Sequence, residues 1–179
     1  MSDASRIVDT YLEANAEHLS VIGRADSAWD VLVPSYWKEA VAVSLNLSPS
    51  RLRGDAFFLR KPDENADKAY RLLLRRNQRA HCWKFAVNDA GDVYLGCEVP
   101  TPGVTAEELD LLFGSLITLV DETYVPYMKL AFGSALEEQV RRGGPGLGRP
   151  PWAADWEPPA RDLAVPGAAD ISPEQPQTP

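Results

Sequence analysis

Four arginines crowd a segment that is expected to form a helix. The residues on one stripe of that helix are Lys68, Arg71, Arg75 and Arg79, and Arg76 lies beside them. Guanidinium groups pair in bidentate fashion with carboxylates and phosphates, so the stripe suggests a surface that recognises an acidic or phosphorylated segment of a partner protein. A solvated helix face, whose late positive charges also suit the helix dipole, is the simpler explanation of the same residues.

Two tryptophans, Trp152 and Trp156, stand in a Pro-rich C-terminal stretch beside acidic residues. Each large ring can bury about 200 Å². The rings either dock onto the core of their own chain, or they form a short linear motif or a strap between subunits. Together with Arg71, Arg75, Arg76 and Arg79 they are candidate partner-binding residues.

No set of side chains with catalytic spacing is found in the sequence. His18 and His81 are the histidines, and His81 precedes Cys82 at the start of an expected strand, where adjacent side chains point to opposite faces. Cys82 and Cys97 lie on neighbouring expected strands and could approach each other, and both are interpreted as reduced, packed thiols. Four metal ligands at loop or helix spacing are lacking. We therefore expect no catalytic residue, no metal, no cofactor and no enzymatic activity.

The charge of the chain limits the partners that it could bind. A net charge of −8 and a pI near 4.8 repel phosphate backbones and anionic lipid surfaces, so neither nucleic acid nor a membrane is an expected partner. No run of about 18 apolar residues could span a bilayer, and the first residues lack the order of a secretory signal. A cytoplasmic location is the resulting expectation.

The N-terminal half reads as one helix followed by three strands. Segment 7–22 has apolar residues at helical spacing, and Gly23 stands where helices often end. Segments 29–33 and 41–47 alternate apolar and polar residues, which is typical of strands. A third strand is expected at 52–60.

That third strand has two unusual features. Gly54 interrupts it and marks either a bulge or a close approach of another group to the backbone. Phe57, Phe58 and Leu59 at its end are expected to be buried.

A helix and a hairpin follow. The helix is expected at 63–77, and the residues assigned to its apolar face are Ala66, Ala69, Tyr70, Leu73 and Leu74. Two strands at 83–87 and 93–99 flank the turn residues 88–92, which resemble a calcium loop but lack its distal glutamate. The pattern predicts a plain antiparallel hairpin.

The last helical region begins at a capping signal, Thr105 followed by Glu108. An apolar stripe then continues to Pro126, which is expected to kink or end the helix because proline lacks a backbone N–H. A second helical piece is expected up to Arg142.

These elements predict one α+β domain at 1–142, with the order α-β-β-β-α-β-β-α and a five-stranded antiparallel sheet packed by helices. Residues 143–179 hold nine of the fifteen prolines and little apolar periodicity. They are expected to form a mobile tail.

The segments in this order resemble the YbjN family, particularly its actinobacterial branch. The matching segments are Trp29-Asp30-Val31, 57–60 with Pro62-Asp63-Glu64-Asn65, Leu73-Leu74-Arg75-Arg76-Asn77, Phe85-Ala86-Val87, Gly91-Asp92-Val93-Tyr94-Leu95 and the helix from Glu107 to Glu122. The resemblance implies a fold similar to type III secretion chaperones, which are small dimers that bind segments of other proteins. It implies no catalytic residues.

Two hypotheses about function follow. The first is a non-enzymatic adaptor or chaperone-like regulator, homodimeric, that binds a partner protein with an acidic segment. The second is a small-molecule sensor or enzyme that uses an Arg-lined cleft for a phosphate or carboxylate ligand. A broad exposed apolar patch favours the first, and a deep pocket with convergent polar groups favours the second.

Overall fold

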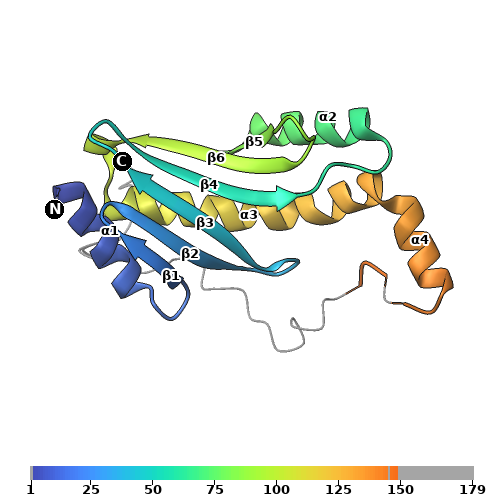
Figure 1. The fold of residues 1–179 in the computed structure, drawn as a ribbon, viewed down its shortest axis with the longest axis horizontal. Coiled ribbons are helices and arrows are strands. Elements are labelled where there is room, and N and C mark those ends of the chain that lie inside the picture. The colour runs from blue at the N-terminus through green and yellow to red at the C-terminus, as the bar shows by residue number, and fades with distance from the viewer. Residues whose placement is uncertain (1, 145, 149–179) are drawn as a thin grey trace, which may run out of the picture.

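The computed structural model describes residues 2–144 and 146–148 (Figure 1). The predicted mobile tail lies mostly outside these residues, and Trp152 and Trp156 lie wholly outside them. The elements, in chain order, are α1 (Asp3–Ala14), β1 (Ser20–Ala25), β2 (Ala28–Ser35), β3 (Glu39–Leu47), β4 (Arg51–Leu59), α2 (Ala66–Asn77), β5 (Lys84–Val87), β6 (Val93–Pro100), a 3-10 turn (Thr101–Gly103), α3 (Ala106–Ala131) and α4 (Gly133–Arg141).

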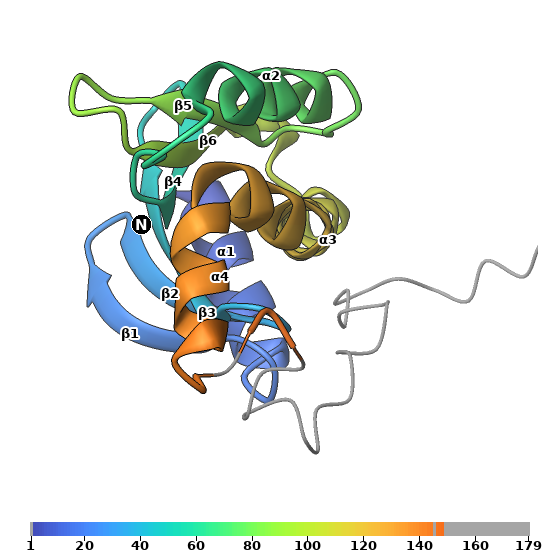
Figure 2. The same ribbon diagram turned by 90° about the vertical axis from the view of Figure 1, so that its right-hand side faces the viewer.

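The strands form one antiparallel sheet in the order β1-β2-β3-β4-β6-β5. The sheet curves around α3, and α1 and α3 lie on the same side of it (Figures 1 and 2). The opposite side, the open face of the sheet, carries no helix among the described residues. The α+β class and the antiparallel pairing are confirmed. The prediction of five strands is wrong, because the described sheet has six.

The sixth strand is β1, which the sequence pattern had assigned to the end of the first helix. Asn15 ends α1 early, and its buried amide donates to the carbonyl oxygen of Tyr11 at 2.9 Å. The chain then turns back and pairs with β2 as an edge strand. Gly23 is therefore a strand residue and not a helix cap, and a Cβ there would lie 2.7 Å from a carboxylate oxygen of Asp30. The apolar residues of a short edge strand happened to continue the helical spacing.

Helix α3 is the longest element and buries one stripe of side chains against the sheet. Thr105 caps it by accepting a hydrogen bond from the Glu108 amide at 3.1 Å, as the sequence predicted. Its buried residues are Leu109, Leu112, Phe113, Leu116, Leu119, Val120, Thr123, Tyr127 and Ala131. Because this stripe spans the whole helix, α3 is the centre of the core.

Pro126 lies inside α3 and does not end it. Proline has no N–H to donate to the carbonyl oxygen four residues earlier, which belongs to Glu122. That oxygen instead accepts a hydrogen bond from Arg76 Nη2 at 3.1 Å, and Arg76 Nη1 also pairs with the Glu122 carboxylate at 3.0 Å. A side chain from α2 thus replaces the hydrogen bond that the proline removes. The break expected at Pro126 occurs at Phe132, where α3 gives way to α4.

Helix α4 ends in a defined cap. The backbone N–H of Gly143 donates to the Val140 carbonyl and that of Gly144 to the Gln139 carbonyl, both at 2.9 Å. Gly143 has φ +81°, the left-handed conformation that such a helix end requires. The sequence change at 143 therefore marks a true helix terminus.

Gly54 in β4 makes room for the centre of the core. A Cβ at this position would lie 2.8 Å from the Trp83 ring and 2.9 Å from the sulfur of Cys97. The buried Trp83 ring donates its N–H to the Leu112 carbonyl of α3 at 2.8 Å. Of the two alternatives for Gly54, the close approach is confirmed, since the register shift in β4 lies between Phe57 and Leu59 instead.

We predict that Arg76→Met lowers the free energy of unfolding by about 1–2 kcal/mol, because it removes two hydrogen bonds from a charged donor. In a Pro126→Ala background the cost should be smaller, since the restored backbone N–H serves the Glu122 carbonyl. Urea unfolding of the double-mutant cycle measures this coupling. Arg75→Met, on the exposed side of α2, is the matched control and should change little. If Arg76→Met lowers the free energy of unfolding equally in both backgrounds, Arg76 does not replace the hydrogen bond that Pro126 removes.

Candidate functional site

The basic stripe, which consists of Lys68, Arg71, Arg75 and Arg79, is exposed on the outer side of α2 and the turn that follows it. The buried side of α2 consists of Ala69 and Leu73 and packs against α3 and β5. Among residues 2–144 and 146–148, the three arginines of the stripe form no ion pair, so their charges remain available.

Three sequence assignments on α2 change. Arg76 points toward α3 and is engaged by Glu122, so it supports the fold and lies apart from the basic stripe. Ala66 and Leu74, which were expected on the apolar face, are exposed, Leu74 to 65%. The helix ends at Asn77 as predicted, and the Asn77 side chain bonds to both the N–H and the carbonyl of Phe85.

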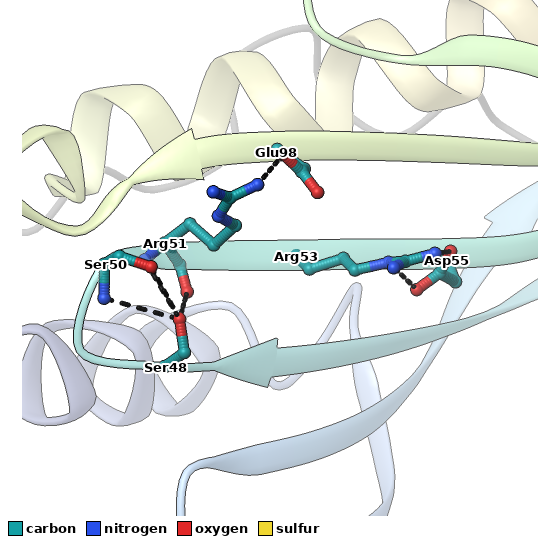
Figure 3. Close-up of polar contacts among 6 residues, drawn as sticks. All are labelled: Ser48, Ser50, Arg51, Arg53, Asp55 and Glu98. Atoms are coloured by element: carbon teal, nitrogen blue, oxygen red, sulfur yellow. Dashed lines mark hydrogen bonds and ion pairs between the residues drawn. The ribbon is translucent and has the colours of Figure 1, made fainter.

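Two ion pairs lie on the open face of the sheet (Figure 3). Arg51 contacts Glu98 across the strands at 2.6 Å, and Arg53 forms a two-pronged pair with Asp55 on its own strand. Ser48 closes the turn before β4 by accepting from the Arg51 amide at 3.1 Å. Each pair cancels its own charges. The apolar residues of the face are therefore the groups that would be stabilised by burial against another molecule.

An exposed apolar patch lies beside these ion pairs. Phe57 of β4 and Tyr94 of β6 are cross-strand neighbours whose rings meet edge to face at 5.3 Å. Phe57 is 46% exposed and Tyr94 is 37% exposed, so the expectation that Phe57 is buried is wrong, whereas Phe58 is fully buried. Ala86 of β5 pairs with Tyr94 and extends the patch to the edge of the sheet.

The patch continues into a groove where the sheet splits. β3 and β4 pair only from Val43 to Leu47, so the last residues of β4 have separated from β3. The space, about 470 Å³, is called the split groove here. Its lining residues are Phe57, Leu59, Arg60, Met128, Phe132, Ala135, Leu136 and Gln139. It therefore joins the end of β4 to the end of α3 and to α4.

A half-buried lysine bridges the split. Lys38, in the turn between β2 and β3, donates its ammonium to the Phe58 carbonyl and lies 5.5 Å from the centre of the Phe57 ring. Burial lowers the pKa of Lys38, because a charged group loses solvation there. The lysine thus ties the free edge of β4 to the neighbouring turn.

That turn is held against α3 by one carboxylate. Asp121 accepts hydrogen bonds from the Ser35 hydroxyl at 2.7 Å and from the amides of Tyr36 and Trp37 at 3.3 and 3.4 Å. The Trp37 ring stacks on Tyr124 of α3 with centres 6.4 Å apart. Because the turn is drawn to α3, β3 leaves β4 and the split groove forms.

The polar groups of the groove are already engaged. Arg60 is the only charged residue in the lining, and it pairs with Asp63 while its guanidinium lies 4.3 Å above the centre of the Phe132 ring. Within the described part of the chain, no three His, Cys, Asp or Glu side chains are grouped so that they could hold a metal ion. The arrangement offers apolar contact area and a rim of fixed charge, which suits the binding of an apolar segment.

The histidine and cysteine residues lie elsewhere. His81 and Cys82 were expected at the start of a strand. They instead form a bend ahead of β5. His81 Nε2 lies 3.2 Å from a carboxylate oxygen of Glu108, Cys82 is partly buried and Cys97 is buried. Both cysteines are free thiols, in agreement with the sequence interpretation.

Comparison with known proteins identifies the family. The YbjN model, described as "Putative bacterial sensory transduction regulator", matches residues 7–125. The chain belongs to the YbjN family. The matched range includes α2, the sheet and most of α3, so the basic stripe and the Phe57–Tyr94 patch lie within the family domain, whereas α4 lies beyond it.

The curated relatives are mycobacterial proteins. The uncharacterized protein Mb0497 of Mycobacterium bovis is 32% identical over 117 residues, which is 65% of this chain and 64% of the relative. The uncharacterized protein ML2442 of Mycobacterium leprae is 30% identical over 95 residues, 53% of this chain and 52% of the relative. The aligned region thus spans less than two thirds of the curated relatives. No described helix is both long and apolar enough to cross a bilayer.

Sequence reasoning found the basic stripe but missed the split groove. The groove is built from side chains up to 82 positions apart, Phe57 to Gln139, and it depends on where two strands stop pairing. One signal was present, namely two consecutive phenylalanines in an alternating strand, of which one must face away from the core.

We predict that changing Arg71, Arg75 and Arg79 together to Glu leaves the fold intact, because exposed charges contribute little to stability individually. The same variant should capture acidic partners less well than wild type does at low salt, and the difference should shrink as salt rises. Pull-down yield across a salt series measures this, with circular dichroism as the folding control. If the folded variant retains every partner at every salt concentration, the stripe is only a solvated helix face.

Proposed function

We propose that this protein is a non-enzymatic regulator that binds an apolar segment of a partner protein in the split groove. The observation that carries the proposal is the continuity between the groove and the exposed Phe57–Tyr94 pair. Both offer large apolar side chains to solvent, and such patches on a soluble domain are typical of protein contact sites. The family description as a sensory transduction regulator supports the same class of function.

The groove lining favours a protein segment over a small polar ligand. A site for a phosphate or carboxylate needs convergent unpaired donors, whereas Arg60 is committed to Asp63. Apolar side chains from Met128, Phe132 and Leu136 supply contact area along one wall. A partner whose apolar residues are flanked by acidic ones would gain further from the basic stripe, if it reaches across α2.

The proposal extends the family resemblance to type III secretion chaperones, including their homodimeric state. The open face of the sheet, which no described helix covers, would be the surface that a second copy buries. The Arg51–Glu98 and Arg53–Asp55 pairs lie on this face, and each would enter such a contact already neutralised within its own chain.

We predict that light scattering at tens of micromolar protein gives a mass close to twice 19.7 kDa. Tyr94→Arg, which places a charge on the open face, should shift the mass toward that of one chain. Val140→Arg, an exposed apolar position on α4, is the control and should leave the mass unchanged. A wild-type mass near 19.7 kDa would count against the homodimer.

A second prediction concerns the groove itself. Leu136→Lys places a charge in the groove and should reduce partner capture at least tenfold, a loss of about 1.4 kcal/mol or more in binding. Leu111→Lys makes the same change at an exposed site on the outer side of α3 and should capture partners as wild type does. Quantitative mass spectrometry of pull-downs from native lysate compares the three proteins. If Leu136→Lys folds and retains the partners that Leu111→Lys retains, the groove is not the binding site.

A further inference from the structure

Lys38 is a half-buried cation without a counter-ion. Its ammonium donates to the Phe58 carbonyl, and among residues 2–144 and 146–148 it makes no other hydrogen bond and no ion pair. Burial lowers the pKa of Lys38, and no nearby carboxylate counters that shift. A cation that has lost part of its hydration is stabilised when an anion takes the place of the lost water. Lys38 therefore has a capacity to bind an anion that the fold leaves unused.

A second lysine of the chain shows the contrast. An ammonium group has three N–H donors. Lys84 has three carbonyl oxygens as acceptors, those of Asn77, Ala80 and His81 at 3.0, 2.8 and 3.4 Å, although this lysine is exposed. Lys38 is less exposed and has one carbonyl oxygen, so its other donors lack an acceptor in the described part of the chain.

The Lys38 ammonium lies beside a wall of the split groove. It is 5.5 Å from the centre of the Phe57 ring and 5.7 Å from that of Phe58. Phe57 lines the groove, whereas Phe58 is buried in the core. The β2–β3 turn, which carries Lys38, lies apart from the end of β4, and no strand pairing joins the two there (Figure 1). A segment that binds along Phe57 therefore comes within reach of the ammonium.

The other charged groups of this region have partners. Asp121 accepts its hydrogen bonds from the β2–β3 turn and forms no ion pair with Lys38. Arg60, which lines the groove, is held by Asp63 in a two-pronged pair. Of the two cations that adjoin the groove wall, Lys38 is thus the one that lacks an anion among the described residues.

We propose that Lys38 binds a carboxylate of the segment that occupies the split groove, so that the partner carries an acidic side chain among apolar ones. The inference rests on the proposed function, because it needs a segment in the groove. The place of the ammonium beside Phe57 and its unused donors carry it. A single ammonium is not the convergent set of donors that a small anion requires, so the apolar side chains of the segment must supply the remaining contact.

Such a site discriminates between segments. A neutral apolar segment would cover Lys38 without compensating its charge, which costs free energy, whereas an acidic side chain at the right position pairs with it. The covering segment also excludes water from the pair and thereby strengthens it. The contribution of Lys38 should therefore depend on salt less than that of the exposed basic stripe.

The test is a selection of random short peptides, displayed on phage, on the immobilised full-length protein. Peptides enriched on the wild type should share apolar residues and, at a fixed position among them, Asp or Glu. Lys38→Met keeps the length of the side chain without its charge, and it should enrich apolar peptides that lack the fixed acidic residue. Lys84→Met is the matched control and should enrich the same peptides as the wild type. Circular dichroism checks the fold of each variant.

A selected peptide then measures the pair directly. Replacing its acidic residue with the corresponding amide should weaken binding to the wild type about tenfold, and binding to Lys38→Met less than about twofold. A carbodiimide couples a carboxylate to an amine that touches it, and on the wild type it should join the peptide to Lys38, as located by peptide mapping. This measurement requires no variant, so it decides the matter even if Lys38→Met does not fold.

Leu136→Gln, which removes an apolar contact of the groove without adding a charge, separates the two levels of the proposal. If no peptide is enriched on the wild type, or if Leu136→Gln binds the enriched peptides equally well, the split groove is not the binding site and the proposed function fails together with this inference. If binding needs Leu136 but the enriched peptides are neutral, the role of Lys38 alone is overturned. The same holds if Lys38→Met still selects the acidic residue, or if the carbodiimide joins it to another lysine.

Discussion

Burial of one side of α3 is the interaction on which the rest of the structure depends. Every other layer is attached to this helix by at least one polar contact as well as by packing. Tyr11 of α1 donates to Asp110, Trp83 donates to the Leu112 carbonyl, and Arg76 of α2 holds Glu122. The apolar stripe supplies most of the stabilisation by burial, while these contacts fix the register of each element along the helix.

The split groove is a consequence of this attachment. A continuous sheet would keep β3 and β4 paired to their ends, but Asp121 holds the β2–β3 turn against α3, so pairing stops at Ala56 of β4. The freed edge of β4 would expose backbone groups, and Lys38 satisfies one of them at Phe58. The candidate binding site is thus located where the packing of α3 outweighs strand pairing.

Local sequence patterns predicted the elements whose cause is local. The hairpin around 88–92 and the cap at Thr105 were predicted because turn and capping residues act within a few positions. The edge strand β1 was missed because Asn15 ends its helix with a buried contact that no periodicity reveals. The role of Arg76 was missed because the carbonyl it serves is left unbonded by Pro126, 50 positions later in the chain. The basic stripe was predicted because its residues follow one another along a single helix. The groove was not predicted because its residues are distant in sequence.

Strand β4 serves both the packing of the core and a wall of the split groove. Gly54 leaves the space that the Trp83 ring and the Cys97 sulfur fill, and Phe57, three residues later on the same strand, forms a wall of the groove. A strand cannot slip by one residue without exchanging its two faces, which would expose Phe58 and bury Phe57. The close packing at Gly54 therefore also fixes which of the two phenylalanines faces the groove.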